Sequence, residues 1–130
     1  MAAGAARRRL SVLEGVFAIC RLPPGAAWPE AGRGPLVSIT RTADEVSVVC
    51  PEVEAPPGAR VEGGWRALKL HGPIPFAETG VLSALAGPVA RAGISLFALS
   101  TYDTDYLLVR DADLAAALDA LRREGFEVGS

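Results

Sequence analysis

The polar residues that could bind or transform a ligand gather in two short segments of the second half of the chain. The first runs from Pro73 to Val81 and places Glu78 and Gly80 directly before an apolar, helix-like stretch. A glycine at a helix N-terminus lets a ligand approach free backbone N–H groups, and the helix dipole favours an anion there. A carboxylate or phosphate could bind at this point without a basic side chain. The same spacing also fits an ordinary helix start that Glu78 or Thr79 caps.

The second segment, residues 100–106, is a predicted hairpin connection that is rich in hydrogen-bonding side chains. Part of this composition is explained by turns, in which Ser, Thr and Asp side chains bond their own backbone. Asp105 is different because it opens an apolar strand, where a carboxylate can pair with a cation such as an α-ammonium group. His71, at the end of the strand before the first segment, is a third candidate. A single histidine is more often a structural edge residue than a catalyst.

Catalytic and metal-binding patterns are weak in this sequence. His71 is the single histidine, and Cys20 and Cys50 lack the spacing of zinc ligands. Both cysteines lie in apolar, strand-like runs, where thiols are usually unreactive core residues. Phosphate-loop and dinucleotide fingerprints are absent from the sequence, and a Glu78–Asp105 acid–base pair has no reacting centre beside it. We therefore expect no enzyme, no metal and no cofactor.

Charge and hydropathy exclude further classes. The chain has 130 residues with 13 Lys and Arg against 15 Asp and Glu, which gives a formal net charge of −2. This balance argues against a nucleic-acid partner, because phosphate contacts need a basic surface. No uncharged apolar run approaches the ~20 residues that cross a bilayer, so no membrane partner is expected. Two cysteines do not make a disulfide framework, and we expect reduced thiols and a cytoplasmic location.

Three arginines, residues 7–9, precede an apolar stretch over residues 10–20. A secretory signal would have to tolerate Glu14 in its apolar centre and Arg21 at its end. We therefore expect residues 1–6 to form a frayed tail and the three arginines to be solvated flanking charges.

Apolar periodicity predicts two helices, residues 78–92 and 113–124, and strands over residues 13–22, 36–41, 46–50, 65–70, 94–101, 105–110 and 126–128. The predicted buried stripes of the helices are Leu82, Leu85 and Val89, and Leu114, Ala117, Leu118 and Leu121. Pro88 should kink or divide the first helix, and Gly125 should end the second. The second half thus has the order βαββαβ, a four-stranded antiparallel sheet with two helices on one face.

Residues 38–49 resemble residues 98–109, sixty positions later, which suggests duplication of a small unit. The alternative is the general similarity of any two β-hairpins. The first half is rich in Pro and Gly between its strands, so its helices should be short or absent. We expect an α+β fold of tandem ferredoxin-like βαββαβ units packed together. A degenerate N-terminal domain would cover residues 1–60 and a second domain residues 61–130.

Four motifs of the second half together resemble the ACT domains of small bacterial proteins, which are related to those of the animal cytosolic arginine sensor. They are Leu70-His71-Gly72-Pro73 and residues 76–82, 92–97 and 100–109, within a resemblance over about residues 64–128. ACT domains are regulatory modules that bind small ligands, usually amino acids, at interfaces between domains or subunits. The first half resembles the ferredoxin-like N-terminal partner of these proteins.

The resemblance implies a ligand-binding set made of Glu78, Thr79, Gly80, Val81, Thr101, Tyr102 and Asp105. Backbone N–H groups near Gly80 and Val81 would take an α-carboxylate, and Glu78 or Asp105 would take a cationic nitrogen. Val81 stands where the family has Ile. The family's remaining ligand contacts come from a partner ACT domain and have no matching position here.

We therefore expect a non-catalytic, amino-acid-binding regulatory protein that is cytoplasmic and homodimeric. The alternative is an interaction module that oligomerises through its sheet edge or helix face and has a vestigial pocket. A small enzyme acting through Glu78, His71 or Asp105 is the third possibility.

Overall fold

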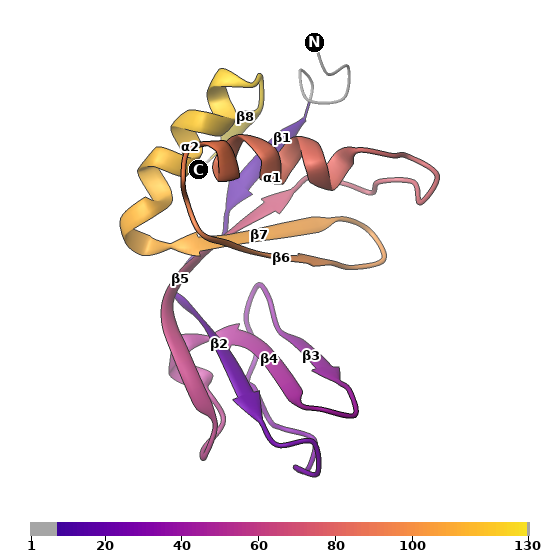
Figure 1. The fold of residues 1–130 in the computed structure, drawn as a ribbon, viewed down its shortest axis with the longest axis vertical. Coiled ribbons are helices and arrows are strands. Elements are labelled where there is room, and N and C mark those ends of the chain that lie inside the picture. The colour runs from indigo at the N-terminus through magenta and orange to yellow at the C-terminus, as the bar shows by residue number, and fades with distance from the viewer. Residues whose placement is uncertain (1–7, 130) are drawn as a thin grey trace. The chain divides into compact units, whose positions relative to one another are not determined.

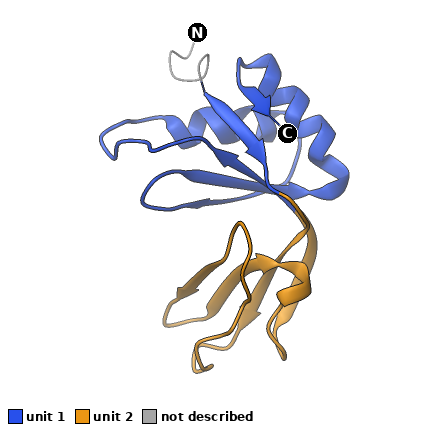
Figure 2. Ribbon diagram, turned by 180° about the vertical axis from the view of Figure 1, so that it is seen from behind, with its two compact units in different colours: residues 1–13, 66–130 blue, residues 14–65 orange. Residues whose placement is uncertain are grey.

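The computed structural model describes residues 8–129, which form eight strands and two α-helices (Figure 1). The chain divides into two compact units, coloured separately in Figure 2. Of the described residues, unit 1 contains 8–13 and 66–129, and unit 2 contains 14–65. Strand β5 (Arg60–Leu70) contributes its first residues to unit 2 and its last residues to unit 1.

Unit 1 consists of a sheet and both helices. Besides its share of β5 it contains β1 (Arg9–Val12), α1 (Val81–Arg91), β6 (Leu96–Ser100), β7 (Asp105–Arg110), the 3-10 turn η3 (Asp111–Asp113), α2 (Leu114–Arg123) and β8 (Glu127–Gly129). Its strands lie in the order β6-β7-β5-β1-β8. Along the chain, β5-α1-β6-β7-α2-β8 is the predicted βαββαβ order. The α+β class and the ferredoxin-like architecture are confirmed.

The two helices share one apolar core with the sheet of unit 1. This core combines Leu85 and Val89 of α1, Ala117 and Leu121 of α2, and Leu10, Leu68, Leu70, Leu107 and Val109 of the strands. Leu114 and Leu118 are half-buried against it, so the predicted stripe of α2 is confirmed. Leu82 was predicted in the stripe of α1 but is exposed, and the first-turn residue that packs against the core is instead Val81, four positions before Leu85.

Helix α2 ends at a glycine, as predicted, whereas α1 runs through its proline. After α2, Gly125 has a φ of +100°, its N–H donates to Arg122 at 3.0 Å, and the Phe126 N–H donates to Leu121 at 3.1 Å. These two bonds form a Schellman motif, which satisfies carbonyls that the helix end would otherwise leave free. Pro88 is buried inside α1, which continues to Arg91. The predicted division of the helix at Pro88 is therefore wrong.

Unit 2 is a β-unit in which all three complete strands are antiparallel to their neighbours. It contains β2 (Phe17–Leu22), β3 (Ser38–Arg41), β4 (Val46–Pro51) and the 3-10 turn η2 (Glu52–Glu54), and its strand order is β3-β4-β2-β5. Residues 14–65 are all described and include no α-helix. The degenerate first half therefore keeps the sheet and lacks the helices, as its Pro and Gly content predicts.

The N-terminal segment differs from the predicted organisation. The strand expected over residues 13–22 begins only at Phe17, because Gly15 turns the chain with a φ of +89° that side-chain-bearing residues rarely adopt. The preceding residues form β1, which pairs antiparallel with β5 and parallel with β8. An otherwise antiparallel ACT-type order thus contains one parallel pair.

Strand β1 belongs to unit 1, whereas we expected contiguous domains over residues 1–60 and 61–130. The reason is packing: Leu10 lies opposite Leu70 and is fully buried in the core beneath the helices. The expected frayed tail, residues 1–6, and Arg7 lie outside the described residues. Neither helix of the described chain is long and apolar enough to cross a membrane.

Candidate functional site

A cavity of about 310 Å³ lies in unit 1, between the start of α1 and the connection from β6 to β7. Of the predicted ligand-binding residues, those that line it are Glu78, Gly80, Val81, Thr101, Tyr102 and Asp105. Its wall is completed by Ile74, Pro75, Phe76, Leu82, Ser100, Asp103 and Thr104. Thr79 is exposed and is not among the lining residues. The fold therefore brings together two sequence segments that were singled out separately.

The start of α1 leaves backbone donors free at this cavity. Gly80 is the N-cap residue, with a left-handed φ of +76°, and no side chain of the described residues caps the helix. The first helical bond joins the Ala84 N–H to the Gly80 carbonyl at 2.9 Å. The N–H groups of residues 81–83 therefore have no intrahelical acceptor. The alternative that Glu78 or Thr79 caps the helix is wrong, because the left-handed glycine takes the N-cap position.

Asp105 supplies a carboxylate to the same cavity. It begins β7 directly opposite Ser100 of β6, and its Oδ1 accepts a hydrogen bond from the Ser100 Oγ at 2.5 Å. The residue is half-buried. Because the side chain that hydrogen-bonds to Asp105 is a neutral hydroxyl, a cationic group of a ligand could pair with this carboxylate.

The β6–β7 connection is a tight, self-bonded turn. The Thr101 N–H donates to the Thr104 carbonyl at 2.8 Å, and the Thr104 N–H donates back to the Thr101 Oγ1 at 3.3 Å. Part of the polar composition of this segment therefore serves the turn itself, as Ser/Thr turns commonly do.

The loop before α1 and this turn are joined by contacts that we did not predict. The Thr104 Oγ1 donates to the Leu70 carbonyl at 2.6 Å, and the Ile74 N–H donates to the Asp103 carbonyl at 2.7 Å. A Cβ on Gly72 would lie 2.8 Å from the Asp103 carbonyl oxygen. A threonine inside a polar turn gives no local signal of a bond to a strand 34 positions earlier.

Two aromatic side chains stand beside the cavity. The rings of Phe76 and Tyr102 meet edge to face, with centroids 4.9 Å apart and an interplanar angle of 80°. The two residues remain 74% and 80% exposed, respectively. Edge-to-face pairs contribute beyond simple area burial, so this pair links the pre-helix loop to the turn and provides an apolar wall.

An ion pair involving Arg8 is the main electrostatic feature that sequence reasoning missed. The guanidinium of Arg8 contacts the carboxylate of Glu78, and the two side chains are only 19% and 34% exposed. We expected the N-terminal arginines to be solvated, which is wrong for Arg8. The Arg8–Glu78 contact could be predicted only from the placement of β1 in the sheet of unit 1, and no local sequence pattern indicates that placement.

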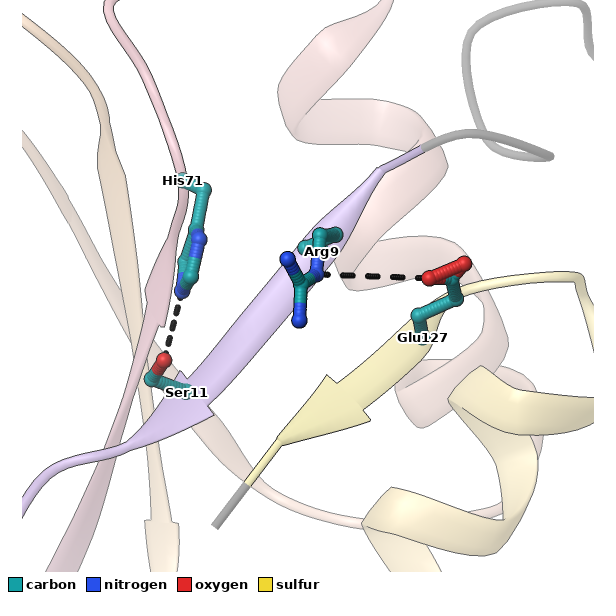
Figure 3. Close-up of polar contacts among 4 residues, drawn as sticks. All are labelled: Arg9, Ser11, His71 and Glu127. Carbon is teal, nitrogen blue, oxygen red and sulfur yellow. Dashed lines mark hydrogen bonds and ion pairs between the residues drawn. The ribbon is translucent and has the colours of Figure 1, made fainter.

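His71 lies away from the cavity. Its Nε2 is 2.5 Å from the Ser11 Oγ, across β1 and β5, and nearby Arg9 faces Glu127 at 4.0 Å (Figure 3). His71 is not among the residues that line the cavity. These contacts support a structural role for His71 at the end of β5.

Cys20 and Cys50 also lie outside the cavity, in the core of unit 2. Both are free thiols, on the neighbouring strands β2 and β4. Burial raises the pKa of Cys20, and burial followed by the neighbouring Cys20 raises the pKa of Cys50 to about 12. Thiols held in the protonated form are poor nucleophiles and metal ligands. The described residues contain no cluster of three or more His, Cys, Asp or Glu that could hold a metal ion.

Comparison with protein families identifies the class of the chain. Residues 60–123 match the ACT domain family, and residues 15–57 match a second family model, described as an N-terminal domain. Residues 60–123 of the chain are therefore an ACT domain, and the resemblance given by the motifs of this half is confirmed.

Particular relatives extend this assignment. The chain is 34% identical over 67 residues to "Cytosolic arginine sensor for mTORC1 subunit 1" from Bos taurus, which covers 51% of this chain and 20% of that protein. The Homo sapiens sensor is 35% identical over 60 residues, covering 45% of this chain and 18% of that protein. The chain thus spans about a fifth of the length of these relatives.

Solved structures share the fold over nearly the whole chain. Protein Atu0741 from Agobacterium tumefaciens is 41% identical with a TM-score of 0.87, covering 95% of this chain and 92% of that one. VC0802 from Vibrio cholerae is 19% identical with a TM-score of 0.72, covering 93% and 92%. Clostridium acetobutylicum aspartate kinase is 8% identical with a TM-score of 0.65, covering 89% and 34%. At 19% and 8% identity, the last two similarities show only that the fold is shared.

Proposed function

We propose that this protein is a non-catalytic regulatory module that binds an amino acid, or a similar small zwitterion, in the cavity of unit 1. One observation carries the proposal: the uncapped N-terminus of α1 and the Asp105 carboxylate line the same cavity of about 310 Å³. A volume at the lower end of the range for small-molecule sites suits a ligand of this size.

The geometry suggests a role for each group. The free N–H groups after Gly80 would take the α-carboxylate, because the helix dipole favours negative charge there. Asp105 would take the α-ammonium through a charge-assisted hydrogen bond. Tyr102 and Val81 would border the ligand side chain. Relatives named as arginine sensors support an amino acid as the ligand class and a cytoplasmic location.

Isothermal titration of the full chain against the twenty common amino acids tests this proposal. We expect saturable binding of at least one of them. Asp105→Asn keeps the hydrogen bond with Ser100 but removes the charge, and it should weaken binding about tenfold or more, since bonds to charged groups contribute ~1.5–3 kcal/mol. Asp119→Asn, an exposed acid on α2 outside the cavity, is the matched control. Absence of binding across the panel contradicts the proposal.

The second candidate function is a ligand-independent interaction module that forms a homodimer. Among the described strands, β6 pairs with β7 alone, and its sequence Leu-Phe-Ala-Leu-Ser carries no charge. Uncharged edge strands are templates for pairing with another chain. Ala98→Lys on this edge should shift the sedimenting species from dimer to monomer. Ala115→Lys, at an exposed position of α2, should not. A dimer that persists without any ligand-induced thermal shift favours this candidate over the first.

A further inference from the structure

Arg8 reaches Glu78 because of the register of β1. Arg8 directly precedes this strand, and its carbonyl extends the pairing with β8 by accepting the Glu127 N–H at 3.0 Å. Strand side chains alternate between the two faces of a sheet. Arg8 therefore points to the same face as Leu10, which lies in the core with α1. Arg9 points to the opposite face, where Figure 3 shows it beside Glu127.

The ion pair compensates Glu78 before any ligand arrives. Arg8 contacts Glu78, and the two side chains are 19% and 34% exposed, so water and salt screen this pair less than a surface pair. Glu78 lines the cavity but Arg8 does not. The Arg8 guanidinium thus pairs with the Glu78 carboxylate from the side of β1 and does not line the cavity.

The remaining charges of the cavity differ in their exposure. Asp103 is exposed, so its carboxylate is hydrated and its pairing with a ligand would be weak. Asp105 is half-buried, and the side chain that hydrogen-bonds to it is the neutral hydroxyl of Ser100. One strong anionic position and the free amides of α1 match one ammonium and one carboxylate.

The rest of the wall suits an uncharged side chain. Apolar and aromatic residues dominate it next to the helix start, namely Ile74, Pro75, Phe76, Val81, Leu82 and Tyr102. A cationic side chain that approached Glu78 would meet the positive charge of Arg8 behind the carboxylate, and like charges repel.

We propose that Arg8 sets the ligand class of this site: by neutralising Glu78 it directs the cavity to an α-amino acid whose side chain carries no positive charge. The inference rests on the proposed function and makes Arg8 a specificity-determining residue that acts through Glu78. It separates the ligand of this chain from that of relatives named for sensing arginine.

Arginine and citrulline provide the direct test, because they have nearly the same shape and differ in side-chain charge. We expect the full chain to bind citrulline about tenfold more tightly than arginine in isothermal titration, a difference of ~1.4 kcal/mol. Arg8→Ala should shift this ratio at least about tenfold toward arginine. Arg9→Ala removes the same charge one residue away, on the other face, and should leave the ratio unchanged. Equal or tighter arginine binding by the wild type overturns the proposal, as does an unchanged ratio in Arg8→Ala.

A measurement without ligand separates this inference from the proposed function. A double-mutant cycle of Arg8→Ala and Glu78→Gln, read as the melting temperature, should be non-additive, with a coupling that weakens in high salt. Additive effects overturn the role of Arg8 even where amino acids bind. If the cycle shows coupling but neither the wild type nor Arg8→Ala binds any amino acid, the proposed function is contradicted. The inferred ligand class is then contradicted as well.

Discussion

The hydroxyl of Thr104 donates a 2.6 Å hydrogen bond to the carbonyl of Leu70, and this bond fixes the β6–β7 turn against the end of β5. Thr104 is the buried polar residue of the described chain, and Leu70 is fully buried in the core of unit 1. Together with the bond from the Ile74 N–H to the Asp103 carbonyl, this bond holds the β6–β7 turn next to the loop before α1, and both segments line the cavity.

Thr104→Val should destabilise the protein. The substitution preserves shape but leaves the Leu70 carbonyl without its donor, which costs ~1–3 kcal/mol for a buried polar group. We expect the melting temperature to fall by several degrees. Thr40→Val, on the exposed edge strand β3, is the control and should change stability by less than ~0.5 kcal/mol. Equal melting temperatures for wild type and Thr104→Val would show that the bond contributes little.

Gly80→Ala should strain the start of α1. Space is not the obstacle, because a Cβ at Gly80 meets nothing within 4 Å. The cost comes from the φ of +76°, which disfavours a residue with a side chain by ~1–2 kcal/mol. Thermal melting should show this loss, and amino-acid affinity should fall as the first turn changes its conformation. Gly25→Ala, at an open position without a positive φ, should leave both quantities near their wild-type values.

Much of unit 1 could be predicted because its signals are local. The apolar spacing of Ala117 and Leu121 predicted the buried face of α2, and Gly125 predicted its end. That the segments around Glu78 and Asp105 form one site was implied by the ACT resemblance and not by a local signal, and both segments line the same cavity.

The features that the sequence did not reveal depend on long-range pairing. Residues 9–12 join unit 1 because Leu10 is buried against Leu70, sixty positions away. No local sequence pattern predicts this placement. The contact of Arg8 with Glu78 follows from the same strand placement. The bond from Thr104 to Leu70 is likewise set by how the turn packs on β5.

Gly72→Ala should disturb the cavity from its base. The new Cβ would lie 2.8 Å from the Asp103 carbonyl oxygen and 3.2 Å from the Ile74 nitrogen, and both neighbours are backbone atoms that yield poorly. The hydrogen bond between Ile74 and Asp103 should therefore lengthen or break. Amide hydrogen exchange at Ile74 should accelerate at least about tenfold, which corresponds to ~1.4 kcal/mol of local opening free energy. Unchanged exchange at Ile74 would mean that the loop relaxes without losing the bond.

Alkaline pH should destabilise unit 2 through its thiols. Burial raises the pKa of Cys50 from 9.0 to about 12, so the folded state holds a proton that the unfolded state releases. The stabilisation is fully present below pH 9 and is lost as the pH rises toward 12. Between these limits each such group lowers the unfolding free energy by up to ~1.4 kcal/mol per pH unit. Denaturant unfolding between about pH 8 and pH 11 measures the decline. Cys50→Ala should make the slope shallower, whereas a variant with the wild-type slope would assign the decline to other groups.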